Sequence, residues 1–133
     1  LLKCYVYYYR SFMAESEPLH ILVADQNEDE GQMLKDILSV DGHGVTSCSD
    51  PGEVDKILEG KKFDIVIEGE GVPLVRHNQA RFNVAYQDRV GWMGHRALKE
   101  LAEKGIIPLD KDPVALGRFI RDRLAHPPFS PAA

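Results

Sequence analysis

The sequence lacks the residue patterns that several protein classes require. Its 133 residues contain only two cysteines, Cys4 and Cys48, and neither belongs to a CxxC motif or to a Cys/His metal-ligand spacing. This excludes a zinc ribbon and a disulfide framework. No apolar run approaches the ~20 residues of a membrane span, and no basic start leads into an apolar core and a cleavage site. We therefore expect a cytoplasmic protein without a membrane partner.

Nucleotide and nucleic-acid signatures are also weak. The first apolar run continues as VADQNEDEG and so lacks the GxGxxG pattern of dinucleotide-binding loops. The formal charge of −5 is unevenly spread: residues 25–70 hold 13 acids against four lysines, whereas residues 74–99 hold five basic residues against Asp88 alone. Dispersed basic residues without interleaved aromatics do not indicate nucleic-acid binding. We expect this stretch to be solvated or to face a protein.

Length and composition indicate one globular domain. With 44% hydrophobic and 28% charged residues, the chain can bury a single core. Residues 1–18 read as an N-terminal extension, in which residues 1–12 resemble upstream sequence and Cys4–Tyr9 would suit an edge strand. The folded domain is expected over residues 19–126, followed by a proline-rich tail at 127–133.

Strand and helix periods alternate along the domain. Short apolar runs predict buried parallel strands at 21–24, 45–48, 63–67, 82–87 and 106–109. Helical spacing predicts helices around Met33 to Leu38, from a cap at Asp50, over Trp92 to Lys104, and from Asp112 through Leu124. Only 13 residues, 69–81, remain to connect the third and fourth strands, so the helix between them must be short or absent.

The alternation predicts an α/β fold, a doubly wound five-stranded parallel sheet in the order 2-1-3-4-5. In such sheets a site forms outside the carboxyl ends of the strands, where the order reverses between the first and third strands. Asp25 and the Glu68–Glu70 segment end those two strands.

Three stretches carry a resemblance to response-regulator receiver domains, which are flavodoxin-like. They are ILVADQNEDEGQMLKDILSVDGHGV, SDPGEVDKILEGKKFDIVIEGEGVP and RALKELAEKGIIPLDKDP, and together they cover roughly residues 20–125. The resemblance implies transfer of a phosphoryl group from a histidine kinase to an aspartate, assisted by Mg²⁺ held by acids and by a lysine.

The residues that would perform this chemistry are missing at most positions. Of the paired metal-binding acids the first falls on Asp25, but the second falls on Gln26, a weaker ligand for a hard cation. The phosphoacceptor, five residues after Asp64, falls on Gly69, which has no side chain. No serine or threonine occurs between Asp50 and Phe129 to serve as the switch hydroxyl.

The remaining family positions are altered too. The lysine falls on Asp112, with Lys111 one position away, and the aromatic residue of the fifth strand falls near Leu109. We therefore interpret the chain as a pseudo-receiver, which is not an enzyme, is not phosphorylated and needs no cofactor, Mg²⁺ included. Asp112 is also well placed to cap a helix, because Pro113 follows it.

Several alternatives stay open. Glu68 and Glu70 either mimic a permanent negative charge or are simply solvated at the strand end, and the second interpretation is favoured. Asp25 and Glu68 are weak candidates for metal binding, and Asp25 also suits the turn into the first helix. A working receiver with Glu68 or Glu70 as a displaced acceptor is one rival function, and a small-molecule-binding module is another.

A protein-protein role needs an interaction surface. The resemblance places it on the fourth helix, fifth strand and last helix, where Trp92, Arg96, Lys99, Arg118 and Arg121 would lie. The expected partners are a signalling protein and a second copy of the chain. His77 and His95 have no partner at ligand or base spacing, so they are expected to serve packing or surface roles.

Overall fold

The computed structural model describes residues 18–125, which form five strands with helices between them. The elements in chain order are β1 (His20–Ala24), α2 (Glu28–Val40), β2 (Gly44–Cys48), η1 (Pro51–Glu53), α3 (Val54–Gly60), β3 (Phe63–Glu68), β4 (Ala80–Ala85), η2 (Asp88–Trp92), α4 (His95–Glu103), β5 (Ile106–Pro108), α5 (Pro113–Phe119) and η3 (Ile120–Ala125).

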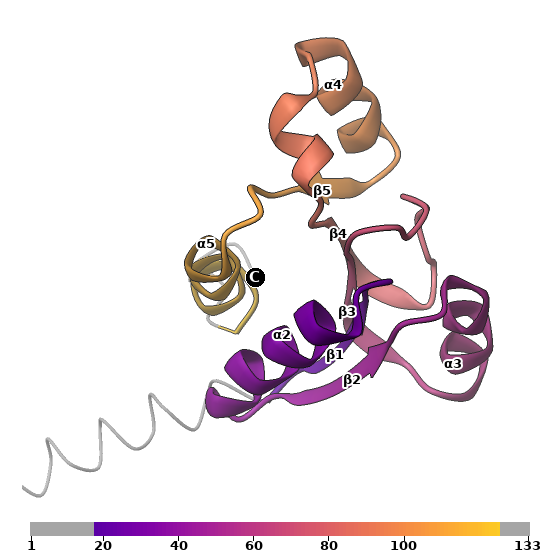
Figure 1. The fold of residues 1–133 in the computed structure, drawn as a ribbon, viewed down its shortest axis with the longest axis vertical. Helices are drawn as coiled ribbons and strands as arrows, with labels where there is room; N and C mark the ends of the chain where they lie inside the picture. Colours follow the sequence, from indigo (N-terminus) through magenta and orange to yellow (C-terminus); the bar gives the residue numbers. More distant parts are fainter. Residues whose placement is uncertain (1–17, 126–133) are drawn as a thin grey trace, which may run out of the picture.

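The strands pair in parallel in the order β2-β1-β3-β4-β5, which confirms the predicted topology (Figure 1). The register sets Ala24 beside both Cys48 and Glu68, and Glu68 beside Ala85. The carboxyl ends of β1, β3 and β4 therefore meet at one edge of the sheet, where the site was expected.

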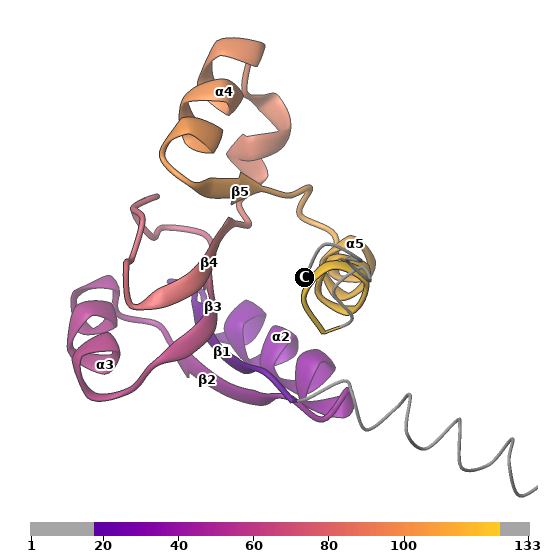
Figure 2. The same cartoon turned by 180° about the vertical axis from the view of Figure 1, so that it is seen from behind.

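Helices cover both faces of the sheet (Figures 1 and 2). Alternate residues of the central strands, such as Ile21 and Ile67, pack with Leu34 of α2 and Leu116 of α5 on one face. The residues between them, such as Leu22 and Val66, pack against α3 on the other face. A third cluster, which includes Ala85 and Leu101, packs α4 against the side of the sheet formed by β4 and β5.

The connection from β3 to β4 contains no helix. Residues 69–79 cross as turns and irregular chain, in agreement with the short spacing in the sequence. Strand β4 begins two residues earlier than predicted and ends at Ala85, so Tyr86 and Gln87 follow the strand. Leu109 likewise follows β5.

Some predictions fall outside the described part of the chain. They are the extension up to residue 17, the tail at 127–133 and the side chain of Leu124. Within residues 18–125, no helix combines the length and the apolar character needed to cross a membrane.

Candidate functional site

Asp25 occupies the centre of the site. It follows β1, is only 1% exposed, and its Oδ1 accepts a hydrogen bond of 2.8 Å from the Asn27 N–H. Its Oδ2 has no hydrogen-bond partner among the described residues. Burial raises the pKa of Asp25, as does the charge of Glu30, while the Asn27 N–H and Lys111 oppose the shift.

Gly69 makes this position of Asp25 possible. Its N–H donates to the Ala24 carbonyl at 2.7 Å, so the two chain segments lie side by side. A Cβ atom added to Gly69 would lie 2.8 Å from Cγ of Asp25 and would overlap its Oδ2. The space beside Gly69 is therefore filled by the carboxyl group of Asp25.

Gln26 packs closely against a second glycine, Gly71. Its N–H donates to the Glu70 carbonyl at 2.8 Å. Gly71 has a φ of 76°, a conformation that side chains rarely adopt, and a Cβ there would lie 2.7 Å from Cβ of Gln26. The loop after β3 thus packs closely against Gln26.

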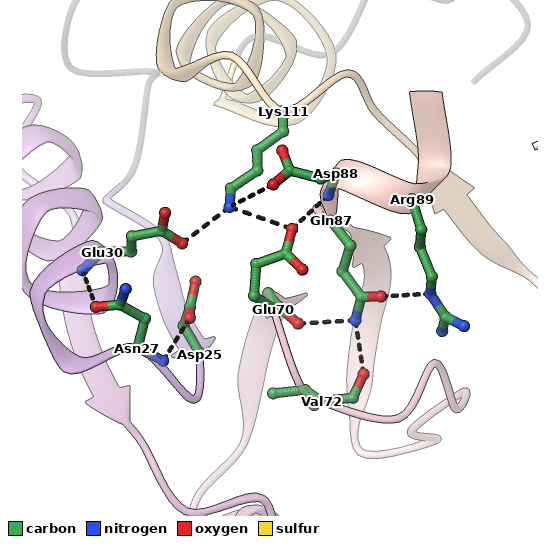
Figure 3. A network of polar contacts seen from close by, with 10 residues as sticks. Asp25, Asn27, Glu30, Glu70, Val72, Gln87, Asp88, Arg89 and Lys111 are labelled. Atoms are coloured by element: carbon green, nitrogen blue, oxygen red, sulfur yellow. Dashed lines mark hydrogen bonds and ion pairs between the residues drawn. The ribbon is translucent and has the colours of Figure 1, made fainter. Parts of the chain in front are cut away.

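Lys111 joins three acids above Asp25 (Figure 3). Its Nζ lies 2.9 Å from Glu30 Oε2, 3.2 Å from Glu70 Oε1 and 3.8 Å from Asp88 Oδ2, and its side chain is 16% exposed. Burial disfavours the charged lysine, but the hydrogen bonds and charges of Glu30 and Glu70 outweigh it and raise the pKa of Lys111. Lys111 is therefore protonated, and its positive charge is already paired with carboxylates.

Glu70 is held on both sides. Its Oε1 accepts hydrogen bonds from Lys111 and from the Asp88 N–H. Partial burial disfavours its charged form, but these hydrogen bonds and the charges of Lys111 and Arg89 outweigh burial and lower the pKa of Glu70. Glu70 is a fixed carboxylate directly beside the lysine.

Gln87 fastens the loop that follows β3 (Figure 3). It is 3% exposed, and its Nε2 donates to the carbonyls of Gly69 at 2.7 Å and Val72 at 2.6 Å. Its Oε1 accepts from Arg89 Nε at 2.6 Å. Every polar atom of this buried amide is thereby satisfied. No motif or spacing in the sequence singles out Gln87.

Comparisons with solved structures find receiver domains. One is a CheY-like response regulator receiver domain protein from Methanospirillum hungatei JF-1, with a TM-score of 0.64, 17% identity, and coverage of 79% of this chain and 92% of that chain. The chemotaxis protein CheY4 of Vibrio cholerae gives a TM-score of 0.60 and 17% identity over 79% and 98% of the two chains. Response regulator TrrA of Thermotoga maritima, solved with Mg²⁺ and BeF, gives a TM-score of 0.59 and 16% sequence identity, with coverage of 77% of this chain and 96% of that chain.

The chain has the CheY-like receiver fold. No family model matches the sequence, and no curated protein matches it.

The residues at the receiver site do not fit Mg²⁺. A hard divalent cation prefers several carboxylate oxygens. Here Gln26 offers only an amide, Gly69 has no side chain, and the nearby Glu30 and Glu70 already pair with Lys111. Among residues 18–125, no group of three or more His, Cys, Asp or Glu is arranged to hold a metal ion.

The lysine of the site is Lys111 rather than the position predicted, Asp112. Asp112 caps α5, because its Oδ1 accepts the Val114 N–H at 3.0 Å. The backbone between β5 and α5 turns Lys111 toward Glu70, so Lys111, one position before Asp112, is the lysine that lies at the site. This hydrogen bond confirms the prediction that Asp112 caps a helix.

Glu68 is not a solvated acid, and this corrects the favoured interpretation. It is 0% exposed and lies under the β3–β4 crossover, where its Oε2 accepts the Val75 N–H at 3.0 Å. Burial raises the pKa of Glu68 to about 8, against the opposing effect of Val75. Glu68 shares the strand face of Val66, which packs against α3, and its contacts lie within the crossover rather than at Lys111.

His77 has two partners, although none was predicted. Its Nε2 lies 3.2 Å from Glu68 Oε1, and its Nδ1 lies 3.8 Å from Asp55 of α3. Its backbone N–H donates to Oδ1 of the buried Asn83 at 2.8 Å. Burial lowers the pKa of His77, while Asp55 opposes this shift. The pairs link residues far apart in the sequence, so spacing alone could not reveal them.

The predicted partner face divides into two separate surfaces. Trp92 is 89% exposed, and Arg96 and Lys99 are exposed on α4. Arg118 and Arg121 instead line a groove shared with α2, where Arg121 lies 3.8 Å from Asp41. The five residues therefore do not form one continuous face.

An open cleft of about 400 Å³ lies beside Asp25, between α2 and the end of β2. Its lining includes Glu28, Asp29, Ser47 and Ser49. Pockets for small molecules are mainly apolar with a few polar groups. This acidic, hydroxyl-rich lining gives little support to the small-molecule alternative.

Proposed function

We propose that this chain is a cytoplasmic pseudo-receiver, a signalling module that acts through contacts with other proteins and is not phosphorylated on aspartate. The observation that carries the proposal is the pairing of Asp25 with Gly69. The position that aligns with the phosphoacceptor has no side chain, and the carboxyl group of Asp25 lies against it.

The ion pairs of Lys111 support the same proposal. A lysine that contacts a phosphoryl group must be available when that group arrives. Lys111 already binds the carboxylates of Glu30 and Glu70 at 2.9 Å and 3.2 Å. We infer that Glu70 supplies a permanent negative charge to this lysine, so that the module keeps one arrangement of its site without modification.

Exposed residues of α4 and of the preceding turn are the proposed contact for a signalling protein. Trp92 presents an almost fully exposed indole, and Arg96 and Lys99 lie nearby in the sequence. Tryptophan and arginine are the residues most enriched at the energetic centres of protein interfaces. The partner that suits them has an apolar contact ringed by acidic side chains.

The proposal is tested by incubating the protein with acetyl phosphate and Mg²⁺ and measuring its intact mass. We expect no gain of roughly 80 Da, the mass of one phosphoryl group. A phosphorylation-competent receiver domain in the same reaction confirms that the donor is active. A stoichiometric adduct that hydroxylamine removes would contradict the proposal.

Glu70 is the specific candidate for the rival function, a receiver with a displaced acceptor. It is an ionised carboxylate beside Lys111, whereas the raised pKa of Glu68 keeps that residue neutral and poorly nucleophilic at pH 7. The variants Glu70→Gln and Glu68→Gln separate the two sites. An adduct that is lost only in Glu70→Gln would establish the rival function.

A further inference from the structure

Exposed apolar side chains gather between α2 and α5. Six large hydrophobic residues are exposed in the described part of the chain, and four of them are Met33, Ile37, Val40 and Val114. The first three follow one another at helical spacing along α2, and Val114 lies in the first turn of α5. Val40 is 85% and Val114 66% exposed. Apolar residues clustered in this way mark an interaction surface.

Three of these residues, Ile37, Val40 and Val114, border a groove of about 470 Å³. Gly117 of α5 lies in its lining, and a Cβ there would meet no atom within 4 Å, so the backbone is open to close approach. Glycine is a poor residue for a helix interior. No packing within the described part of the chain requires glycine at this position.

The two walls of the groove carry opposite charges. The α2 wall ends at Asp41, with the exposed Asp36 on the same helix, and the α5 wall carries Arg118 and Arg121. Arg121 and Asp41 lie 3.8 Å apart with both side chains partly exposed, which is a weak pair within one molecule. A surface with an apolar centre, one acidic wall and one basic wall complements a copy of itself turned by 180°.

We propose that this groove is the interface for a second copy of the chain in a two-fold symmetric dimer. Each α2 then lies across the partner's α5, the valines meet at the centre, and each acidic wall faces a basic wall. This surface is separate from the α4 contact proposed above and does not depend on it. The apolar stripe is short, so we expect a dimer that dissociates on dilution.

The test measures the mass of the full chain in solution by light scattering or sedimentation over a range of micromolar concentrations. We expect a mass that rises from 14.9 kDa toward twice that value. Val40→Glu and Val114→Asp should each leave a monomer. Val75→Glu, at an exposed valine of the crossover loop, is the matched control and should still dimerise.

Charge exchange makes the test specific to the two-fold arrangement. The variant Arg118→Glu/Arg121→Glu has two acidic walls and Asp36→Lys/Asp41→Lys has two basic walls, so each should dimerise at least tenfold more weakly than the original protein. A mixture of the two variants should recover the dimer. A monomeric original protein would overturn the proposal. The proposal would also be overturned if Val40→Glu did not weaken the dimer, or if the two charge variants failed to associate when mixed.

Discussion

At the residue scale, Asp25 reaches the centre of the site because Gly69 carries no side chain. The two residues lie beside each other at the carboxyl ends of β1 and β3, and each position depends on the other. Gln26 and Gly71 form a second pair of the same kind. A side chain at position 69 would therefore require Asp25 or the loop to move.

Gly69→Ala tests this close approach. The added methyl group must displace Asp25 or the loop, and overpacking of this kind costs about 1–3 kcal/mol of unfolding free energy. Urea unfolding measures the change. Gly60→Ala is the control, because a Cβ there meets nothing within 4 Å and should leave stability unchanged or slightly raised. Equal effects of the two substitutions would argue against the packing of Asp25 on Gly69.

The apolar runs placed Asp25 and the Glu68–Glu70 segment at two strand ends, and the resemblance to receiver domains singled out Gln26 and Gly69. The sequence left Asp112 and Lys111 as neighbouring candidates, because the turn between β5 and α5 decides which of them faces the site. The burial of Glu68 could not be predicted either. Its partners, His77 and Val75, lie in a crossover whose conformation follows no periodic pattern.

At the element scale, the main departure from regular alternation is the helix-free crossover between β3 and β4. Polar residues take the place of a packed helix there: Glu68 and Asn83 project from the sheet, and His77 bridges them to Asp55 of α3. The strands and the other helices were predictable because each carries a continuous apolar run or a helical stripe. The spacing of 13 residues predicted only that a crossover helix was short or absent.

The burial of Glu68 makes stability depend on pH. Glu68 has a pKa of about 8 in the folded protein and 4.5 as its ordinary value, so the folded state holds its proton more tightly. The stabilisation is complete below pH 4.5 and is lost as the pH rises through 8. Burial lowers the pKa of His77, so its imidazole is neutral at any pH above the ordinary pKa of histidine. Asp55 faces its other ring nitrogen.

Glu68→Gln removes this titration. Between pH 6 and pH 9 we expect the unfolding free energy of the original protein to fall relative to that of Glu68→Gln by on the order of 2 kcal/mol. Urea unfolding at each pH measures the difference. The surface variant Glu59→Gln should follow the original protein. A constant difference between the original protein and Glu68→Gln would mean that Glu68 does not bind a proton in the folded state.

At the scale of the whole molecule, the structure combines an internally paired site at the carboxyl edge of the sheet with two separate surfaces for which we propose protein contacts. Lys111 pairs with three of the acids at the carboxyl edge of the sheet. The α4 surface and the α2–α5 groove lie on different parts of the molecule (Figures 1 and 2). In the proposed arrangement, the α4 surface would bind a signalling partner and the α2–α5 groove would join two copies of the chain.

The most direct test of the internally paired site is an NMR titration of the labelled protein with Mg²⁺ and beryllofluoride, which imitates a phosphoryl group on a carboxylate. Because Asp25 fills the space beside Gly69 and Lys111 is already paired, we predict that the amide resonances of Asp25, Gly69 and Glu70 will not move. Saturable shifts of these resonances, accompanied by a bound fluoride signal, would contradict the account.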